Sequence, residues 1–234
     1  MRTLVGSAEK RVSPVPAPSR SRRLWAGAAA VEAGAAAMAI VLDLLIPTLV
    51  LLAMTALSLL VRRRGLGSLG LHRLAEWSLV LKMLVFAAAW SLFQLGVTKP
   101  IANHISGERQ DLSGFEGLEG DPGMLAGFLV LGWTLAAFGE ELAYRGYLLS
   151  RLRDALGGGR TALVVAVLAS SLLFGLAHDE QGLIGVLVVT LDALAWAGLR
   201  LHYKNLWASI LAHGFNNSLG FITFFFVGPI YGLW

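Results

Sequence analysis

Cysteine is absent from this 234-residue sequence, and charged residues make up only 15% of it. Without cysteine the chain can form no disulfide, no thiolate nucleophile and no cysteine-ligated zinc site. Soluble domains are about 25% charged and about 45–50% apolar, whereas this chain is 56% apolar. That composition excludes an ordinary soluble enzyme, a disordered tail and a nucleic-acid-binding module. The net charge of +4 is better explained by membrane-topology signals than by a nucleic-acid partner.

Long apolar runs dominate the rest of the sequence. A backbone in lipid must satisfy its own hydrogen bonds, and a spanning helix needs about 20 apolar residues. The sequence therefore predicts an all-α fold, a polytopic transmembrane helical bundle of about seven spans, with the last four helices carrying the functional site. The predicted spans cover residues 26–42, 45–61, 77–97, 124–149, 162–177, 182–199 and 206–227.

Composition divides the chain into four segments. Residues 1–24 hold six basic residues and one acid, and we expect a basic cytoplasmic arm there. Residues 25–97 are expected to be N-terminal transmembrane helices, 98–123 an external polar loop, and 124–234 the transmembrane core with the candidate catalytic residues. The arm and the apolar stretch 26–42 also fit a secretory signal, but further spans follow at once and favour a retained helix.

Turn residues and charge give the orientation of the spans. Asp43 and Pro47 predict the break between the first two helices, because aspartate caps a helix and proline suits its first turn. Basic residues cluster at 62–64, 145–160 and 200–204, whereas acids predominate in the segment 98–123. The positive-inside rule then gives a cytoplasmic N-terminus and an external C-terminus. We expect an integral protein of a prokaryotic plasma membrane.

Two adjacent carboxylates, Glu140 and Glu141, lie near the end of one apolar span. At 100° per residue Glu141 shares a helix face with Arg145, in the favourable order for an i,i+4 ion pair. Glu140 points to a neighbouring face beside Tyr144. We therefore expect Arg145 to compensate Glu141 and leave Glu140 available as a general base. The alternative is a buried structural ion network without catalytic function.

Two histidines follow on later spans. His178 ends the next apolar stretch in the motif Phe174-x-x-x-His178, and His213 lies one helical turn before Asn217 in the last span. A single membrane histidine often serves only helix packing. Two histidines, a carboxylate and an asparagine from three helices are better suited to activating water and holding an oxyanion.

Helix lengths indicate whether these residues can meet. The glycines at 157–159 join two motif helices, and Glu140 and His178 lie at nearly equal distances from that turn. His213 is only about 12 Å beyond the turn near Asn205, at about 1.5 Å per residue. The motifs can therefore meet only if the hairpin around 157–159 projects further into the cytoplasm than the turn before the last span.

The remaining ionisable residues in apolar stretches have simpler explanations. Asp43 belongs to a turn, Lys82 can extend to the interface from the start of its span, and Glu32 is expected to face another helix. Asp192 has no partner at helical spacing in its own span, and we do not expect a direct catalytic role for it.

The ordered motifs resemble a known family. Glu140-Glu141-x-x-x-Arg145, Phe174-x-x-x-His178 and His213-x-x-x-Asn217 are similar to the three motifs of the type II CAAX prenyl endopeptidases, also called the CAAX protease and bacteriocin-processing (Abi) family of glutamate intramembrane proteases. The resemblance covers roughly residues 124–220. Each motif is weak alone, but the ordered set is specific, and no motif position departs from the pattern.

The resemblance implies an intramembrane endopeptidase that hydrolyses a peptide bond near the membrane interface. The position matching Glu140 would activate water with help from His178. His213 and Asn217 would support the oxyanion. The expected substrate is a membrane protein or peptide with a lipidated or apolar tail, and the lipid bilayer is the other expected partner; nucleic acid is not expected.

In the same pattern Glu141 and Arg145 would hold the motif helix in place. We expect no cofactor. Zinc is the alternative, because two histidines and a glutamate can provide three ligands of a catalytic site. No compact His-Glu-x-x-His motif is present, however, and the metal-free reaction is favoured.

Two other function classes compete with the protease. A non-proteolytic immunity or regulatory scaffold of the same family would keep the fold without turnover, but retention of all six polar motif residues favours the enzyme. A small-solute transporter would show inverted repeats or broken helices. We detect neither in the sequence.

The orientation can be tested with single cysteines, because the chain has none of its own. Leu112→Cys in the acidic segment should react with a membrane-impermeant maleimide from the external side. Gly158→Cys, between the basic residues of 145–160, should react only after the membrane is permeabilised. Labelling of position 112 from the cytoplasmic side alone would reverse the orientation.

Overall fold

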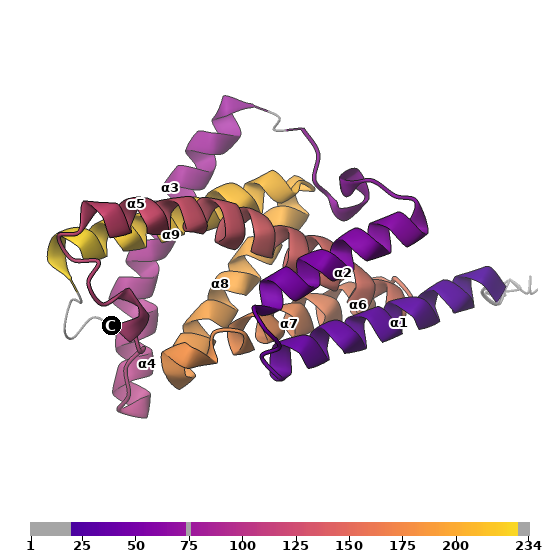
Figure 1. Cartoon of the computed structure of the whole chain (residues 1–234), viewed down its shortest axis with the longest axis horizontal. Coiled ribbons are helices and arrows are strands. Elements are labelled where there is room, and N and C mark those ends of the chain that lie inside the picture. The colour runs from indigo at the N-terminus through magenta and orange to yellow at the C-terminus, as the bar shows by residue number, and fades with distance from the viewer. Residues whose placement is uncertain (1–19, 74–75, 229–234) are drawn as a thin grey trace, which may run out of the picture.

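The computed structural model describes residues 20–73 and 76–228. Most of the expected basic arm, residues 1–19, lies outside the described residues. Within them the chain is helical without strands, as expected (Figure 1). The helices are α1 Arg20–Val41, α2 Pro47–Arg62, α3 Trp77–Phe93, α4 Lys99–Ser106, α5 Pro122–Leu131, α6 Leu149–Ala155, α7 Arg160–Leu176, α8 Gly182–Tyr203 and α9 Leu206–Val227.

Two π-helical segments join some of these helices into longer rods. Gln94–Thr98 connects α3 to α4, and Gly132–Leu148 connects α5 to α6. Among the described residues, five helices are long and apolar enough to cross a membrane, and two shorter apolar helices, α2 and α7, accompany them. Many large apolar side chains on these helices point outward, as lipid contact requires. The helical membrane bundle is confirmed, and the protein is an integral membrane protein.

The first helical hairpin is held by polar contacts between its two helices. Glu32 on α1 forms an ion pair with Arg62 on α2 and accepts a hydrogen bond of 2.6 Å from Ser58. Glu32 therefore faces another helix, as expected. The expected capping role of Asp43 is wrong: Ile46 precedes Pro47 at the start of α2, and Asp43 lies in the turn with φ +45°.

The expected polar loop at 98–123 is shorter in the structure. Helix α4 continues to Ser106, so the loop begins at Gly107 and ends at Asp121, which caps α5 with its side chain. Proline lacks an N–H and usually disrupts a helix. Here Pro100 is the second residue of α4 and lies two residues after the π-helical turn Gln94–Thr98, where the regular hydrogen-bond ladder has already changed.

The helix that carries both glutamates is also different from the expectation. Residues 132–148 are π-helical, with hydrogen bonds to the fifth preceding residue, whereas the sequence analysis assumed α-helical geometry. π-Helical turns are rare and occur often at functional sites. Glu141 and Arg145 still lie close together in the π-helix, because in its wider turn residues four apart and residues five apart are both neighbours.

The hairpin around residues 157–159 extends further than the turn before α9, as expected. Gly146 packs beside the first residue of α9, Leu206, and a Cβ at Gly146 would lie 3.3 Å from the Leu206 side chain. All of α6 therefore extends beyond the start of α9, beside α1 and α7 (Figure 1). This arrangement brings Glu141 and His213 to one depth.

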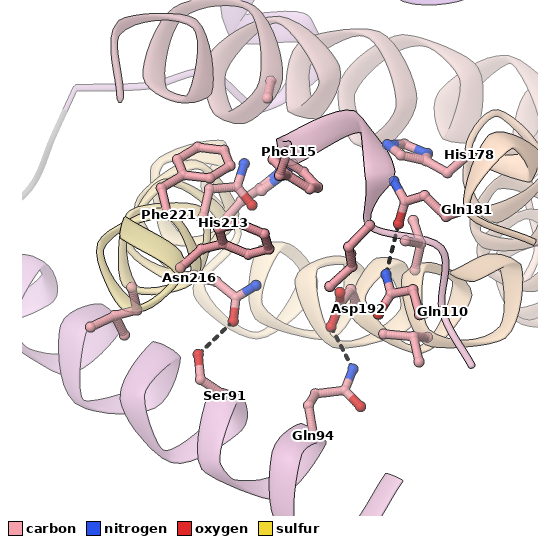
Figure 2. A pocket seen from close by; sticks show the side chains of 18 of the residues that line it. Ser91, Gln94, Gln110, Phe115, His178, Gln181, Asp192, His213, Asn216 and Phe221 are labelled. Atoms are coloured by element: carbon pink, nitrogen blue, oxygen red, sulfur yellow. Dashed lines mark hydrogen bonds between the residues drawn. The ribbon is translucent and has the colours of Figure 1, made fainter. Parts of the chain in front are cut away.

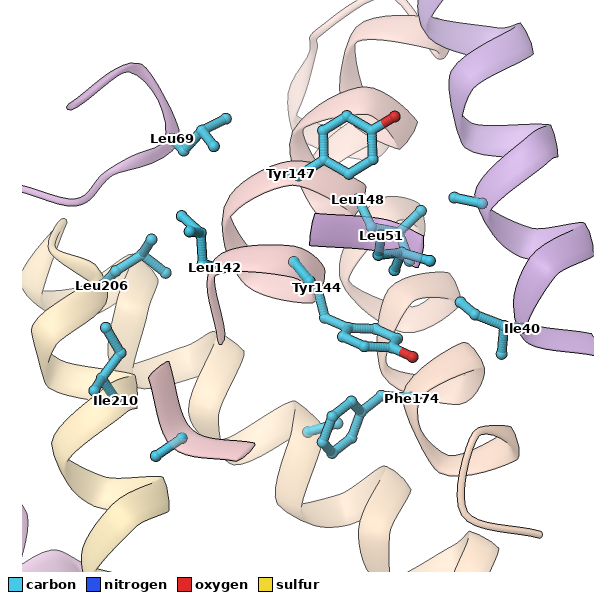
Figure 3. Packing of buried hydrophobic residues seen from close by; sticks show 14 of the residues in the cluster. Ile40, Leu51, Leu69, Leu142, Tyr144, Tyr147, Leu148, Phe174, Leu206 and Ile210 are labelled. Atoms are coloured by element: carbon cyan, nitrogen blue, oxygen red, sulfur yellow. The ribbon is translucent and has the colours of Figure 1, made fainter. Parts of the chain in front are cut away.

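A buried apolar cluster connects the first hairpin to the site helices. Its labelled members in Figure 3 include Tyr144 and Phe174 and come from the first two helices, the short 3-10 turn Leu66–Leu69, the π-helix, α7 and α9. Tyr144 meets Phe174 edge to face, with ring centroids 4.9 Å apart. The N-terminal hairpin thus supports the π-helix from behind.

Helices α7 and α8 approach each other closely at Gly175. A Cβ at Gly175 would lie 2.0 Å from Thr190 Oγ1 and 2.6 Å from the backbone oxygen of Val186. We expect Gly175→Ala to destabilise the protein by about 1–3 kcal/mol through overpacking. Thermal unfolding of the purified protein in detergent measures the change.

Gly198→Ala on α8 is the matched control, because nothing lies within 4 Å of that added methyl group. Alanine is the better helix former, so this variant should unfold at the same temperature or a higher one. Equal melting temperatures for Gly175→Ala and the unmodified protein would contradict the close packing.

Candidate active site

A cavity of about 380 Å³ lies between α3, the π-helix Gly132–Leu148, α8 and α9. The four residues expected to be catalytic, Glu140, His178, His213 and Asn217, all line it. Figure 2 shows His178 and His213 together with polar side chains from α3, α8 and the loop before α5. Three sequence motifs separated by up to 77 residues therefore contribute to one cavity.

The second glutamate of the first motif lies behind this cavity. Glu141 Oε1 is 3.0 Å from Arg145 Nη1, and the two side chains are only 0% and 2% exposed. The guanidinium also lies 4.1 Å from the ring centroid of Phe174. The predicted Glu141–Arg145 pair is therefore present and buried against the second motif.

His213 contacts both glutamates. Its Nδ1 lies 3.0 Å from Glu141 Oε1, and its Nε2 lies 3.9 Å from Glu140 Oε2. An ionised carboxylate only accepts hydrogen bonds, so Nδ1 donates to Glu141. The ring is stacked on Trp196 at 6.0 Å and meets the edge of Phe174 at 6.1 Å. The position and orientation of this histidine are thus fixed on several sides.

His178 is oriented by its own helix. Its Nδ1 lies 2.9 Å from the backbone oxygen of Phe174, which can only accept a hydrogen bond. Nδ1 therefore carries a proton, and in the neutral ring Nε2 is an acceptor. A neutral His178 can accept a proton from a water molecule in the cavity.

The asparagines of the third motif lie on the same side of the cavity. Asn217 lines it directly, and Asn216 accepts a hydrogen bond of 2.8 Å from Ser91 on α3. Close approach of the π-helix to α9 depends on Gly132, where a Cβ would lie 2.9 Å from the ring of Phe221. The contact between Asn216 and Ser91 is not visible from sequence spacing.

Asp192 is more closely involved than its sequence context indicates. Its Oδ1 accepts hydrogen bonds from Trp90 Nε1 at 2.6 Å and Gln94 Nε2 at 2.8 Å, and the residue lines the cavity. Asp192 has no partner within its own span, as expected, but it has two from another helix: Trp90 lies on α3 and Gln94 in the π-helical turn that follows α3. Trp90 also packs edge-on against Trp196, the residue that stacks on His213.

The alternative of a zinc site can be checked against the positions of the histidine and carboxylate side chains. Within residues 20–73 and 76–228, no group of three or more histidine, aspartate or glutamate side chains is arranged to hold a metal ion. His213 has its Nδ1 engaged with Glu141, and His178 has its Nδ1 engaged with a backbone oxygen. Each histidine therefore presents only Nε2.

Several residues that line the cavity were not selected from the sequence as candidate site residues. Gln94, Lys99 and Gln110 lie in segments that were expected to be a span end or a loop. Trp196 was not selected, although it lies one helical turn after Asp192 and so on the same face of α8. An intramembrane carboxylate followed at i+4 by an aromatic residue would have pointed to that face.

Part of the chain matches a known protein family. Residues 122–219 match the family described as type II CAAX prenyl endopeptidase Rce1-like. No curated protein and no solved structure matches the chain. The matched region contains all six motif residues of the candidate site, from Glu140 to Asn217. Over residues 122–219 the chain is therefore similar to the Rce1-like type II CAAX prenyl endopeptidase family.

Proposed function

We propose that this protein is an intramembrane endopeptidase in which Glu140 and His178 activate water for hydrolysis of a peptide bond. The family of the domain supports a peptidase. The observation that carries the proposal is the different surroundings of the two glutamates. Glu141 is paired with Arg145, whereas Glu140 lines the cavity and its Oε2 lies 3.9 Å from His213 Nε2.

The reaction follows from these positions. Glu140 removes a proton from water while the water oxygen forms a bond to the substrate carbonyl carbon. His178 accepts a hydrogen bond from the same water and orients it. The tetrahedral intermediate then collapses with cleavage of the C–N bond. The proton held by Glu140 passes to the leaving amine, which gives a carboxylic acid and an amine.

The oxyanion is stabilised by His213 and Asn217. His213 donates through Nδ1 to Glu141, so its Nε2 donates to an oxyanion only when the ring is protonated.

The substrate is a membrane protein or peptide with an apolar or lipidated tail. Its identity can be found by comparing membrane peptides that accumulate in cells producing the unmodified protein and the Glu140→Ala variant. Peptides that differ between the two strains are candidate substrates. No difference in any peptide, with both proteins present in the membrane, would favour the non-proteolytic scaffold.

Glu140→Gln should remove the general base and preserve the fold, because glutamine is nearly isosteric with glutamate. We expect the turnover rate of a purified substrate to fall by about 100- to 10,000-fold. Glu108→Gln in the exposed loop is the matched control and should retain full activity. A folded Glu140→Gln variant with unchanged turnover would show that another group is the base.

Asn217→Ala should remove one donor to the oxyanion. Loss of such a donor typically costs about 2.7–4 kcal/mol in the transition state, so kcat should fall roughly 100- to 1000-fold with little change in KM. The reaction should proceed without metal and survive exhaustive chelation. Activity that disappears with chelator, returns with stoichiometric zinc and accompanies one zinc per chain would instead identify a metalloprotease.

A further inference from the structure

The cavity extends from the proposed catalytic residues toward one end of the helical bundle. On α9 its lining runs from His213 to Phe224, close to the end of the helix. On α8 it runs from Val188 to Trp196, and Gln181, directly before that helix, also lines it. Because α8 and α9 form a hairpin, the start of α8 and the end of α9 lie at the same end of the bundle. His213 and Trp196 therefore mark the inner limit of the cavity.

The loop 107–121 covers this end of the bundle, which we call the loop end. The N–H of Asp111 donates to the carbonyl of the residue before α8, and the N–H of Gly120 donates to the Phe225 carbonyl, both at 3.0 Å. The loop thus connects the start of α8 to the end of α9 (Figure 1). Gly220, which lines the cavity, is exposed, and a Cβ there would have no atom within 4 Å. The cavity therefore reaches the surface of the protein at this level of α9.

Apolar side chains are packed tightly at the opposite end. Three leucines converge on Gly146, where a Cβ would lie between 3.3 and 3.5 Å from each of them: Leu69, Leu142 and Leu206. All three are buried, and Figure 3 shows them in one group with Ile210. A polypeptide that entered the bundle here would have to separate these side chains and lose their buried contacts.

The two ends also differ in charge. The end formed by α6, the turn 66–73 and the connection from α8 to α9, which we call the basic end, carries exposed cations: Arg63, Arg64, Arg73, Arg153, Arg160 and Lys204. The loop end carries exposed acids: Asp111, Glu116, Glu119, Asp121, Asp179 and Glu180. The positive-inside rule assigns the basic end to the cytoplasm and the loop end to the external side.

We propose that substrates reach Glu140 from the external half of the membrane, so that the bond cleaved lies in an external segment of a membrane-anchored protein or in an exported peptide. This inference rests on the proposed function and names the class of substrate. A lipidated tail at the cytoplasmic surface would instead meet the basic end, where the packed leucines separate it from Glu140.

The order of events follows from this direction of access. The substrate segment crosses the membrane before it is cleaved, so insertion or export precedes hydrolysis. The fragment that is not anchored leaves on the external side. A cytoplasmic protein that carries a lipid at its C-terminus is therefore not a substrate of this site.

Single cysteines can show from which side the cavity is reached, because the chain has none of its own. Ser91→Cys places a nearly isosteric thiol on the cavity lining, and Gly220→Cys places one where the cavity reaches the surface. Ser68→Cys is the matched control in an exposed turn at the basic end. The probe is a small membrane-impermeant cation, trimethylammonium-ethyl methanethiosulfonate, added to spheroplasts or to inside-out vesicles.

In spheroplasts we expect Ser91→Cys and Gly220→Cys to react and Ser68→Cys to remain unmodified. In inside-out vesicles the pattern should be reversed. Thiols that remain free are then counted with a maleimide after solubilisation, and thermal unfolding verifies that each variant is folded.

Reaction of the two cavity thiols only in inside-out vesicles would overturn the proposal, whether or not Ser68→Cys reacts there as well. So would folded Ser91→Cys and Gly220→Cys variants that react from neither side. Labelling requires no catalysis. An absence of turnover by the unmodified enzyme would therefore count against the proposed function and leave the side of access readable.

The location of the cleaved peptides tests the substrate class. Fragments that depend on the unmodified protein should appear in the external fraction. Their uncleaved precursors should accumulate in cells with Glu140→Ala, where trypsin added to spheroplasts digests them. Fragments confined to the cytoplasm would overturn the proposal and still support proteolysis, whereas no fragment in any fraction would contradict the proposed function itself.

Discussion

The buried contact between Glu141 and Arg145 is the interaction on which the site depends. Taking two charges out of water is costly, and removing one partner of such a pair typically costs about 3–5 kcal/mol. The same carboxylate oxygen also accepts the hydrogen bond from His213, and the guanidinium lies over Phe174. One ion pair therefore connects all three motif helices. Glu141 is committed to these contacts, whereas the neighbouring Glu140 lines the cavity.

The two glutamates lie next to each other in a π-helical segment and face different neighbours. Within Gly132–Leu148, Glu140 lines the cavity, whereas Glu141 contacts Arg145 and His213. The apolar cluster around Tyr144 and Phe174 packs against the opposite side of this segment and supports it. The energetic cost of an unusual helix is thus offset by contacts with α2, α7 and α9.

Hydropathy and helical spacing were sufficient to predict much of this arrangement. The spans, the glycine turn at 157–159 and the Glu141–Arg145 pair depend on residues close in sequence, where periodicity is informative. The π-helix could not be predicted, because hydrogen bonding to the fifth residue leaves no distinct pattern of apolar residues. The partners of Asp192 are 98 and 102 residues away on α3, so only tertiary packing reveals them.

The two sides of the cavity come from different parts of the chain. Glu140, His178, His213 and Asn217 lie inside the region that matches the family, residues 122–219, whereas Gln94 and Gln110 precede it. The two sides of the cavity can therefore change separately during evolution. A lineage that altered α3 and the loop 107–121 would reshape one wall of the cavity and leave the motif residues of the other wall in place.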